Sequence, residues 1–178
     1  MDNTDEIVIP ETVTAVFMTK DSSEKAYGEL MDRGYKPDEI TVLISDETRD
    51  VHFQERQDTD LTKKALENAG LGSAIGGTVG AVTGAIAAIG TAVVVPGLGI
   101  AVAGPILASL TGAGAGGLTG GIIGALVGSG VSQRHAEHYD KSLKEGGIII
   151  GFKPKTVQDR MDIITAWNSY GGRQIHED

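Results

Sequence analysis

Residues 68–133 form a stretch of 66 residues that contains no Asp, Glu, Lys, Arg or His. Glycine recurs at every fourth position in two parts of this stretch. Because residues spaced by four share one face of an α-helix, each series predicts a helix with a bare stripe, against which another backbone packs closely. The predicted helix-packing and oligomer-interface residues are Gly72, Gly76, Gly80 and Gly84 in the first series, and Gly112, Gly116, Gly120, Gly124 and Gly128 in the second.

Such helices need compensation from packing. A glycine inside a helix costs about 1 kcal/mol relative to alanine, so the nine glycines would disfavour isolated helices by roughly 9 kcal/mol. Close contact between helix backbones supplies the compensation through dispersion and weak Cα–H···O bonds. Pro96, Gly97 and Gly99 interrupt the stretch near its middle. We therefore predict a helical hairpin over residues 59–133, with its turn at these three residues.

Two environments would bury the apolar faces of this hairpin. A membrane span takes about 20 apolar residues, and the stretch is long enough for two arms. Against a bilayer, no aromatic residue lies between Phe53 and Tyr139 to mark a membrane interface. The alternative is a helical core shared between subunits. Both environments disfavour a lone soluble monomer, because monomers seldom expose so large an apolar patch.

The N-terminal flank predicts a strand, a helix and a second strand. Residues 14–18 and 40–44 are rich in β-branched and apolar residues, as buried strands are. Between them, Asp21 and Glu24 have the spacing of a capping box, and Gly34 supplies a stop for the helix.

The C-terminal flank repeats this plan after a polar helix over residues 133–144. Residues 148–152 predict a strand and residues 173–176 a short last strand. The intervening helix begins near Thr156 and ends at the Gly171–Gly172 pair. Its predicted apolar face carries Val157, Met161, Ile164 and Trp167.

Together the flanks predict an α+β fold. We expect a ferredoxin-like split β-α-β domain, with helices over one face of a four-stranded sheet, interrupted by the long glycine-zipper helical hairpin. The predicted boundaries are residues 1–58 for the first half, 59–133 for the hairpin and 134–178 for the second half.

Composition excludes several classes of function. The chain has 24 acidic and 15 basic residues and a net charge of −9, which argues against binding to nucleic acid. It has no cysteine, so disulfides, thiolate catalysis and thiolate metal sites are excluded. The acidic N-terminus lacks the features of a secretory signal, so we expect a cytoplasmic protein, attached to or inserted in the inner membrane if the hairpin enters a bilayer.

Candidate chemical motifs are weak. Gly112, Gly114 and Gly117 match the G-x-G-x-x-G pattern, but a dinucleotide site also needs a preceding strand. His135 and His138 share a helix face without an evident third ligand, so solvated helix residues are the better interpretation. We expect no cofactor, no metal and no catalytic residues.

Two large aromatic residues are candidates for binding a ligand. Tyr139 and Trp167 could stack on a ligand, but aromatics at helical spacing from apolar residues are more often part of a core. We interpret both as core residues.

Three stretches carry a family resemblance. They are the opening strand-helix-strand unit with its Gly34-Tyr35 turn, the PGLG to GPIL segment at residues 96–107 with the second glycine series, and AEHY at residues 136–139 leading to LKEGGIII at 143–150. In these the chain resembles a bacterial family of general stress proteins, also called low-temperature-induced proteins, whose domain is of unknown function. The resemblance implies an α+β flank domain, stress-linked expression and membrane association, and it implies no catalytic residues.

The expected function follows from these observations. We expect a non-enzymatic stress-response or structural protein that self-associates through the glycine-zipper hairpin and is membrane-associated. One alternative is a soluble homo-oligomeric assembly (a closed shell, ring or filament) with the hairpins buried between subunits. Another is a small-ligand sensor that uses the α+β domain. The expected partners are further copies of the chain and a lipid bilayer, but not nucleic acid.

Overall fold

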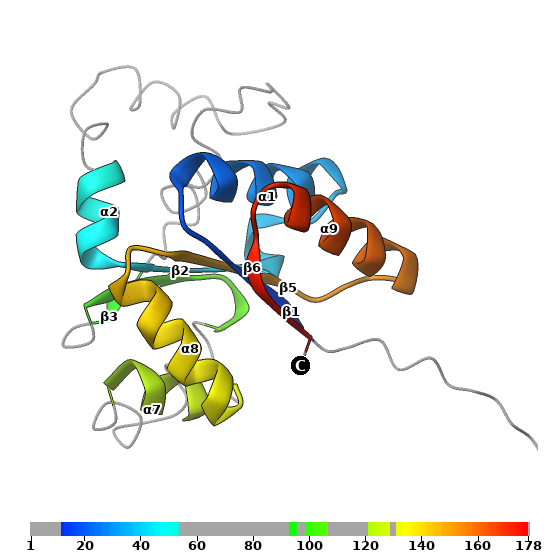
Figure 1. The fold of residues 1–178 in the computed structure, drawn as a ribbon. Coiled ribbons are helices and arrows are strands. Elements are labelled where there is room, and N and C mark those ends of the chain that lie inside the picture. Colours follow the sequence, from blue (N-terminus) through cyan, green and yellow to red (C-terminus); the bar gives the residue numbers. More distant parts are fainter. Residues whose placement is uncertain (1–11, 54–92, 96–98, 107–120, 129–130, 178) are drawn as a thin grey trace, which may run out of the picture.

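The computed structural model describes residues 12–53, 93–95, 99–106, 121–128 and 131–177, and these form a mixed α+β fold (Figure 1). One sheet has the strand order β3-β4-β2-β5-β1-β6, and all neighbouring strands are antiparallel. The strands are β1 (Val13–Phe17), β2 (Ile40–Ser45), β3 (Val93–Val95), β4 (Ile100–Ala103), β5 (Ile148–Phe152) and β6 (Arg173–Glu177). The helices are α1 (Lys20–Asp32), α2 (Asp46–Phe53), α7 (Gly121–Gly128), α8 (Gln133–Lys144) and α9 (Val157–Ser169), with a 3-10 turn η1 (Pro37–Glu39).

The sheet has a core on each face. Successive strand residues point to opposite faces, and in β5 Ile148, Ile150 and Phe152 belong to one buried cluster while Ile149 belongs to the other. Helices α1 and α9 cover the first face, and α7 and α8 cover the second (Figure 1). The flank helices α1 and α9 thus share one face, and a second helical layer on the other face, made by α7 and α8, was not expected.

The first half follows the predicted strand-helix-strand order, but its helix cap differs. Thr19, in extended conformation, caps α1, and its hydroxyl accepts a hydrogen bond from the Ser22 amide at 3.2 Å. The predicted capping box at Asp21 and Glu24 is wrong, because the helix has already begun at Lys20. The predicted stop at Gly34 is confirmed. Its φ of +81° lies in the left-handed region that glycine tolerates best.

The second half contains the predicted elements at nearly the predicted boundaries. Thr156 caps α9, its hydroxyl accepting from the Asp159 amide at 3.0 Å, and Gly171 follows the helix with a φ of +83°. The predicted apolar face of α9 is wrong in one respect. Ile163 and Trp167, four residues apart, are fully buried, whereas Met161 is 55% exposed. Met161 is two residues from Ile163, which places it on nearly the opposite side of the helix.

Part of the predicted helical hairpin is β-structure. Residues Val93–Val95 and Ile100–Ala103 form strands β3 and β4, which add to the sheet beside β2. Three consecutive valines suit a strand because their branched side chains restrict χ1. Pro105 and Ile106, directly after the turn at Gly104, are helical. Residues 59–92, 96–98, 107–120 and 129–130 of the predicted hairpin lie outside the described residues.

Gly104 marks the point where β4 ends against β2. Its φ is +85°, and a Cβ atom at this position would lie 2.0 Å from the backbone oxygen of Ile40. No other residue type fits without moving the backbone of β2. The backbones of Gly104 and Ile40 therefore lie in close contact where β4 ends beside β2.

Candidate interaction surface and polar cluster

Two of the nine predicted interface glycines lie in a described element. Gly124 and Gly128 belong to α7, and of the predicted turn residues Gly99 is described, with a φ of +64°. The Gly99 carbonyl accepts a hydrogen bond from the Asp46 amide at 2.8 Å, so the turn is joined to the start of α2. The remaining predicted residues lie outside the described ones: Gly72, Gly76, Gly80, Gly84, Gly112, Gly116, Gly120, Pro96 and Gly97.

One buried leucine sets the orientation of α7. Leu126 is fully buried in the second core cluster, whereas the next residue, Val127, is 41% exposed. At 3.6 residues per turn, Gly124 and Gly128 each lie about 160° around the helix axis from Leu126. The two glycines therefore share the side of α7 that faces away from the core contact of Leu126. We call this side, made by Gly124, Val127 and Gly128, the glycine face of α7.

Helix α8 connects α7 to the sheet. Ser132 caps α8 by accepting from the His135 amide at 3.4 Å, and the Val131 amide donates to the Leu126 carbonyl at 3.1 Å. Tyr139 is buried against the second face, and its hydroxyl is hydrogen-bonded to the hydroxyl of Thr14 in β1. The interpretation of Tyr139 as a core residue is confirmed.

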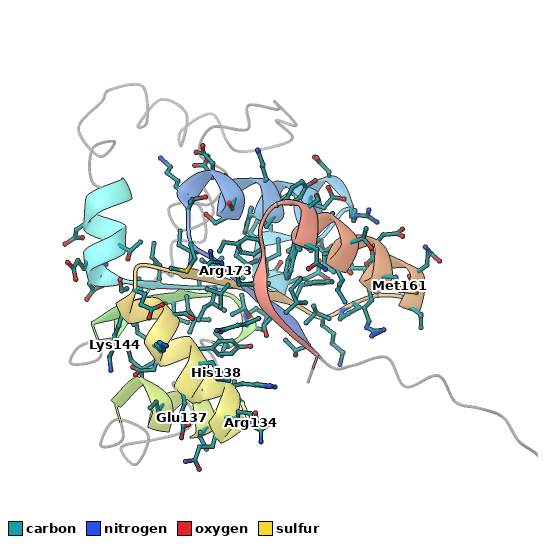
Figure 2. The ribbon with its side chains drawn as sticks, viewed as in Figure 1. Arg134, Glu137, His138, Lys144, Met161 and Arg173 are labelled. Carbon is teal, nitrogen blue, oxygen red and sulfur yellow. The ribbon has the colours of Figure 1, made fainter. Side chains whose placement is uncertain are left out.

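The outer side of α8 is a solvated polar surface. Figure 2 shows Arg134, Glu137, His138 and Lys144 along this helix. Lys144 pairs with Asp140 at 2.7 Å, one helical turn away, as expected for an exposed helix.

The predicted chemical motifs acquire no structural support. His138 is exposed, and the ring centroid of the half-buried His135 lies 6.4 Å from that of Tyr139. Among the described residues, no three His, Asp or Glu side chains are grouped so as to hold a metal ion. The glycines of the G-x-G-x-x-G pattern lie outside the described residues.

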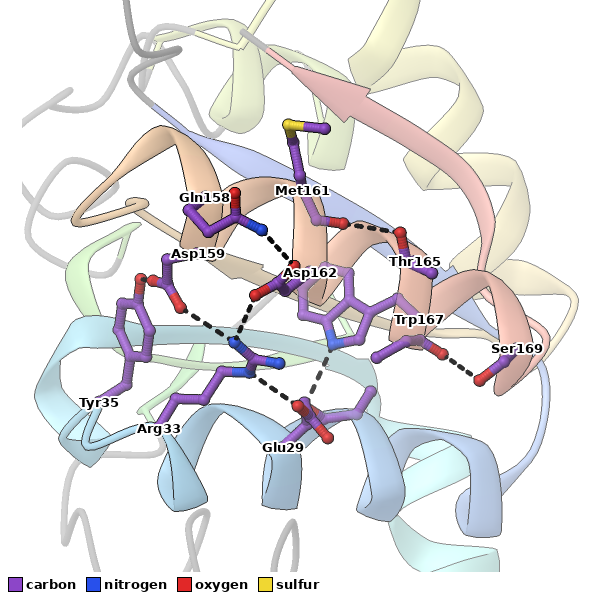
Figure 3. Close-up of polar contacts among 12 residues, drawn as sticks. Glu29, Arg33, Tyr35, Gln158, Asp159, Met161, Asp162, Thr165, Trp167 and Ser169 are labelled. Atoms are coloured by element: carbon purple, nitrogen blue, oxygen red, sulfur yellow. Dashed lines mark hydrogen bonds and ion pairs between the residues drawn. The ribbon is translucent and has the colours of Figure 1, made fainter.

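A polar cluster joins the two halves of the domain where the end of α1 meets the start of α9 (Figure 3). Arg33 lies at its centre. Its guanidinium is 2.7 Å from the Glu29 carboxylate and 3.5 Å from each of the Asp159 and Asp162 carboxylates. Hydrogen bonding to Glu29 raises the pKa of Arg33 further. The Arg33 guanidinium thus pairs with carboxylates from both α1 and α9.

Tyr35 makes the second connection in this cluster. Its hydroxyl donates to the Asp159 carboxylate and accepts from the Lys155 amide at 3.1 Å. The Lys155 ammonium lies 4.3 Å from the centroid of the Tyr35 ring and 3.0 Å from the Gly34 carbonyl oxygen. Burial and the bond to Asp159 raise the pKa of Tyr35 above its ordinary value. The phenol therefore remains a neutral donor over the physiological range.

Glu39, at the rim of the cluster, also has partners for its negative charge. The Glu39 carboxylate accepts from the Lys36 amide at 2.8 Å and lies 3.5 Å from the Lys155 ammonium. These interactions lower the pKa of Glu39, and the hydrogen bond from the Lys36 amide contributes most. Because its charges are paired with one another, the cluster acts as a clasp between α1 and α9.

Sequence reasoning did not find this clasp. Its partners come from two distant parts of the chain, and Tyr35 and Asp159, for example, are separated by 124 positions. The only local signal was the Gly34 turn, which presents Tyr35 directly after α1.

Trp167 contributes the hydrophobic centre beneath the clasp. It is fully buried, stacks edge-on against Phe17 and Phe152 at centroid separations of 5.5 and 5.2 Å, and donates from its indole nitrogen to the Ala26 carbonyl at 3.2 Å. The interpretation of Trp167 as a core residue is confirmed.

Within the described part of the chain, no helix has both the length and the apolar character needed to cross a membrane.

Comparison of the chain with protein-family models, with curated protein sequences and with solved structures found no match.

Proposed function

We propose that this chain is a non-enzymatic structural protein of the stress-response type, which self-associates through its glycine-rich stretch. The observation that carries the proposal is the orientation of α7. Leu126 is buried in the protein's own core, while helix geometry places Gly128 and the half-buried Gly124 on the other side of α7, beside the exposed Val127. Small residues on such a side allow the backbone of a second helix to approach closely.

The flanks support this proposal as a scaffold. Their four strands have the spatial order β2-β5-β1-β6, with α1 and α9 on one face, as in a ferredoxin-like split β-α-β domain. The polar clasp pairs its own charges across the two helices, which favours a structural role over a catalytic one. The domain would thus display the glycine-rich stretch to its partners.

The partners that we propose are other copies of the chain and a lipid bilayer on its cytoplasmic side. The 66-residue stretch without charge is the feature that favours both. The soluble assembly with the stretch buried between subunits differs from this only in what covers the apolar surface.

A single substitution in α7 tests the proposal. Gly124→Leu places a large side chain on the glycine face, and it also replaces glycine by a better helix former. We expect the mass of the purified protein, measured by light scattering in detergent-free buffer, to fall from an oligomer to a monomer while the far-ultraviolet circular dichroism is retained. A loss of α7 cannot then explain the dissociation, because leucine favours the helix.

Gly28→Leu is the matched control. Gly28 lies in α1, and a Cβ atom there would meet nothing within 4 Å. This variant should keep the oligomer. A monomeric wild-type protein, or a Gly124→Leu oligomer of unchanged mass, would contradict the proposal.

The bilayer part of the proposal has its own measurement. Wild-type protein expressed in cells should remain in the membrane pellet after an alkaline carbonate wash. Release into the supernatant as a discrete oligomer would replace the membrane association by the soluble assembly. The double variant Gly76→Leu with Gly120→Leu extends the test to both glycine series, and its flank domain should remain folded.

A further inference from the structure

All the sulfur in this chain belongs to methionine. The sequence contains four methionines and no cysteine. Three of the methionines, Met18, Met31 and Met161, lie in the part of the chain that the structure describes. Oxidants convert the methionine thioether into a sulfoxide, and reductases reverse this reaction. The surroundings of the three side chains therefore decide where an oxidant reaches the sulfur atoms of the protein.

Two of these methionines are exposed to solvent. The exposed large apolar side chains of the described residues are Met161, at 55%, Val127, at 41%, and Met31, at 40%. Two of these three side chains are methionines, although the chain contains only four. Met31 lies in α1 and Met161 in α9, so each of the two helices on the first face of the sheet carries one exposed thioether.

Met18 has different surroundings. It follows β1 directly, is half-buried and packs against the second core cluster. Its sulfur lies 3.3 Å from the position that a Cβ atom at Gly147 would take, so it is close to the backbone just before β5. A sulfoxide oxygen at Met18 would disturb this packing, because it makes an apolar side chain polar. Met18 is therefore the reference for a methionine that the fold protects.

The helix that carries Met161 is held by contacts on its other side. Trp167 is fully buried, and Asp159 and Asp162 each lie 3.5 Å from the Arg33 guanidinium. Figure 3 shows the Met161 side chain pointing away from Arg33 and Trp167. An oxygen atom added to the Met161 sulfur would therefore enter solvent rather than the core, and the contacts that hold α9 would remain.

We propose that Met161 and Met31 are sites of reversible oxidation by peroxides, at which the protein takes up oxygen without unfolding. The thioether sulfur attacks one oxygen of hydrogen peroxide, the O–O bond breaks, and the products are a sulfoxide and water. The sulfur is oxidised and the peroxide is reduced. The modification makes the exposed surfaces of α1 and α9 more polar. This inference does not depend on the proposed self-association, because it concerns helices of the flanks.

Peptide mapping by mass spectrometry tests the selectivity. Wild-type protein would be treated with hydrogen peroxide, and the oxygen added at each methionine would be followed with time. We expect Met161 to oxidise fastest, Met31 next, and Met18 several times more slowly than either. Unfolding in urea should leave the rate at Met161 nearly unchanged and raise the rate at Met18 to a similar value. Equal rates at Met18 and Met161 in the folded protein, or a rate at Met161 that rises strongly on unfolding, would overturn the inference.

Stability and reversal give two further measurements. Oxidation of Met161 and Met31 should shift Tm by at most about 2 °C, as expected for changes at exposed side chains. The matched variant, Met31→Leu with Met161→Leu, should fold normally, and stronger peroxide treatment should then oxidise Met18 and lower its Tm further. Methionine sulfoxide reductases should remove the oxygen from both exposed sites. An equal fall in Tm in the two proteins, or sulfoxides that resist the reductases, would contradict the proposal.

Discussion

The two faces of the sheet differ in the side chains that fill them. The face under α1 and α9 is rich in aromatic residues (Phe17, Tyr27, Tyr35, Phe152 and Trp167) and is closed by the polar clasp. The face under α7 and α8 is mainly aliphatic, with Tyr139 as its buried aromatic residue. The first face therefore has a network of ion pairs and hydrogen bonds between its two helices, while the second depends mainly on apolar packing, with the hydrogen bond between Tyr139 and Thr14 as a directional contact.

The difference corresponds to where the helices lie in the sequence. Both helices of the first face come from the charged flanks, whereas α7 comes from the uncharged stretch. A helix without polar side chains has no ion pairs to hold it in place. Its attachment must come from buried apolar residues such as Leu126.

The largest expected effect concerns the centre of the aromatic face. Trp167→Ala should lower the free energy of unfolding by about 3–5 kcal/mol, because it leaves a cavity and removes the hydrogen bond to Ala26. Urea unfolding followed by circular dichroism measures this. Met161→Ala on the same helix, at a side chain that is 55% exposed, should change stability by at most about 0.5 kcal/mol. A similar loss from both variants would show that the aromatic face is not the main source of stability.

The aliphatic face should be affected less strongly. Leu126→Ala removes the fully buried residue of α7 and should cost about 2–4 kcal/mol. Met31→Ala in α1, at a side chain that is 40% exposed, is the control and should be nearly neutral. Trp167 is the only tryptophan and lies on the other face. If the two faces unfold as one unit, its fluorescence and the circular dichroism should give coincident transitions. Separate transitions would mean that the faces are independent.

Two tyrosines of the aromatic face give the smallest and sharpest contrast. Tyr35→Phe removes the hydroxyl that joins Asp159 and Lys155 and should cost about 1–2 kcal/mol. The Tyr27 hydroxyl is buried and, within the described part of the chain, has no hydrogen-bond partner. Tyr27→Phe should therefore be neutral or stabilising. Urea unfolding at neutral pH measures both, and equal losses would refute the assigned role of the clasp.

The raised pKa of Tyr35 predicts that the stability of the protein depends on pH. The folded protein raises the pKa of Tyr35 above its ordinary value of 10.0, so the stability from this group is fully present below about pH 10. Above that pH the unfolded chain loses the proton first, and the free energy of unfolding falls as the pH rises. Tyr35→Phe should make this alkaline decline less steep, which unfolding at a series of pH values would measure.

Sequence reasoning located most elements of the flanks. Glycine stops at Gly34 and Gly171 and the cap at Thr156 are local signals, so neighbouring residues suffice to find them. The cap at Thr19 was missed because Asp21 and Glu24 match the same pattern two residues later. The burial of Ile163 in place of Met161 depends on how α9 packs on the sheet, which spacing alone does not determine.

The missed features depend on contacts between distant parts of the chain. Strands β3 and β4 lie between the two glycine series, within the stretch predicted as a helical hairpin, and they form because the edge of β2 is available to pair with β4. The clasp likewise needs α1 and α9 to be placed side by side before its charges meet. The glycine face was predicted as a pattern, but its direction came only from the burial of Leu126.

Attachment of β4 to β2 has a topological consequence. The long segment between α2 and α8 is fastened to the domain at an intermediate point as well as at its ends. Its two parts therefore close as separate, shorter loops, and a lengthening of either would add only a small, logarithmic entropic cost of its own. Natural variation in the length of one part could thus accumulate without shifting the anchoring of the other.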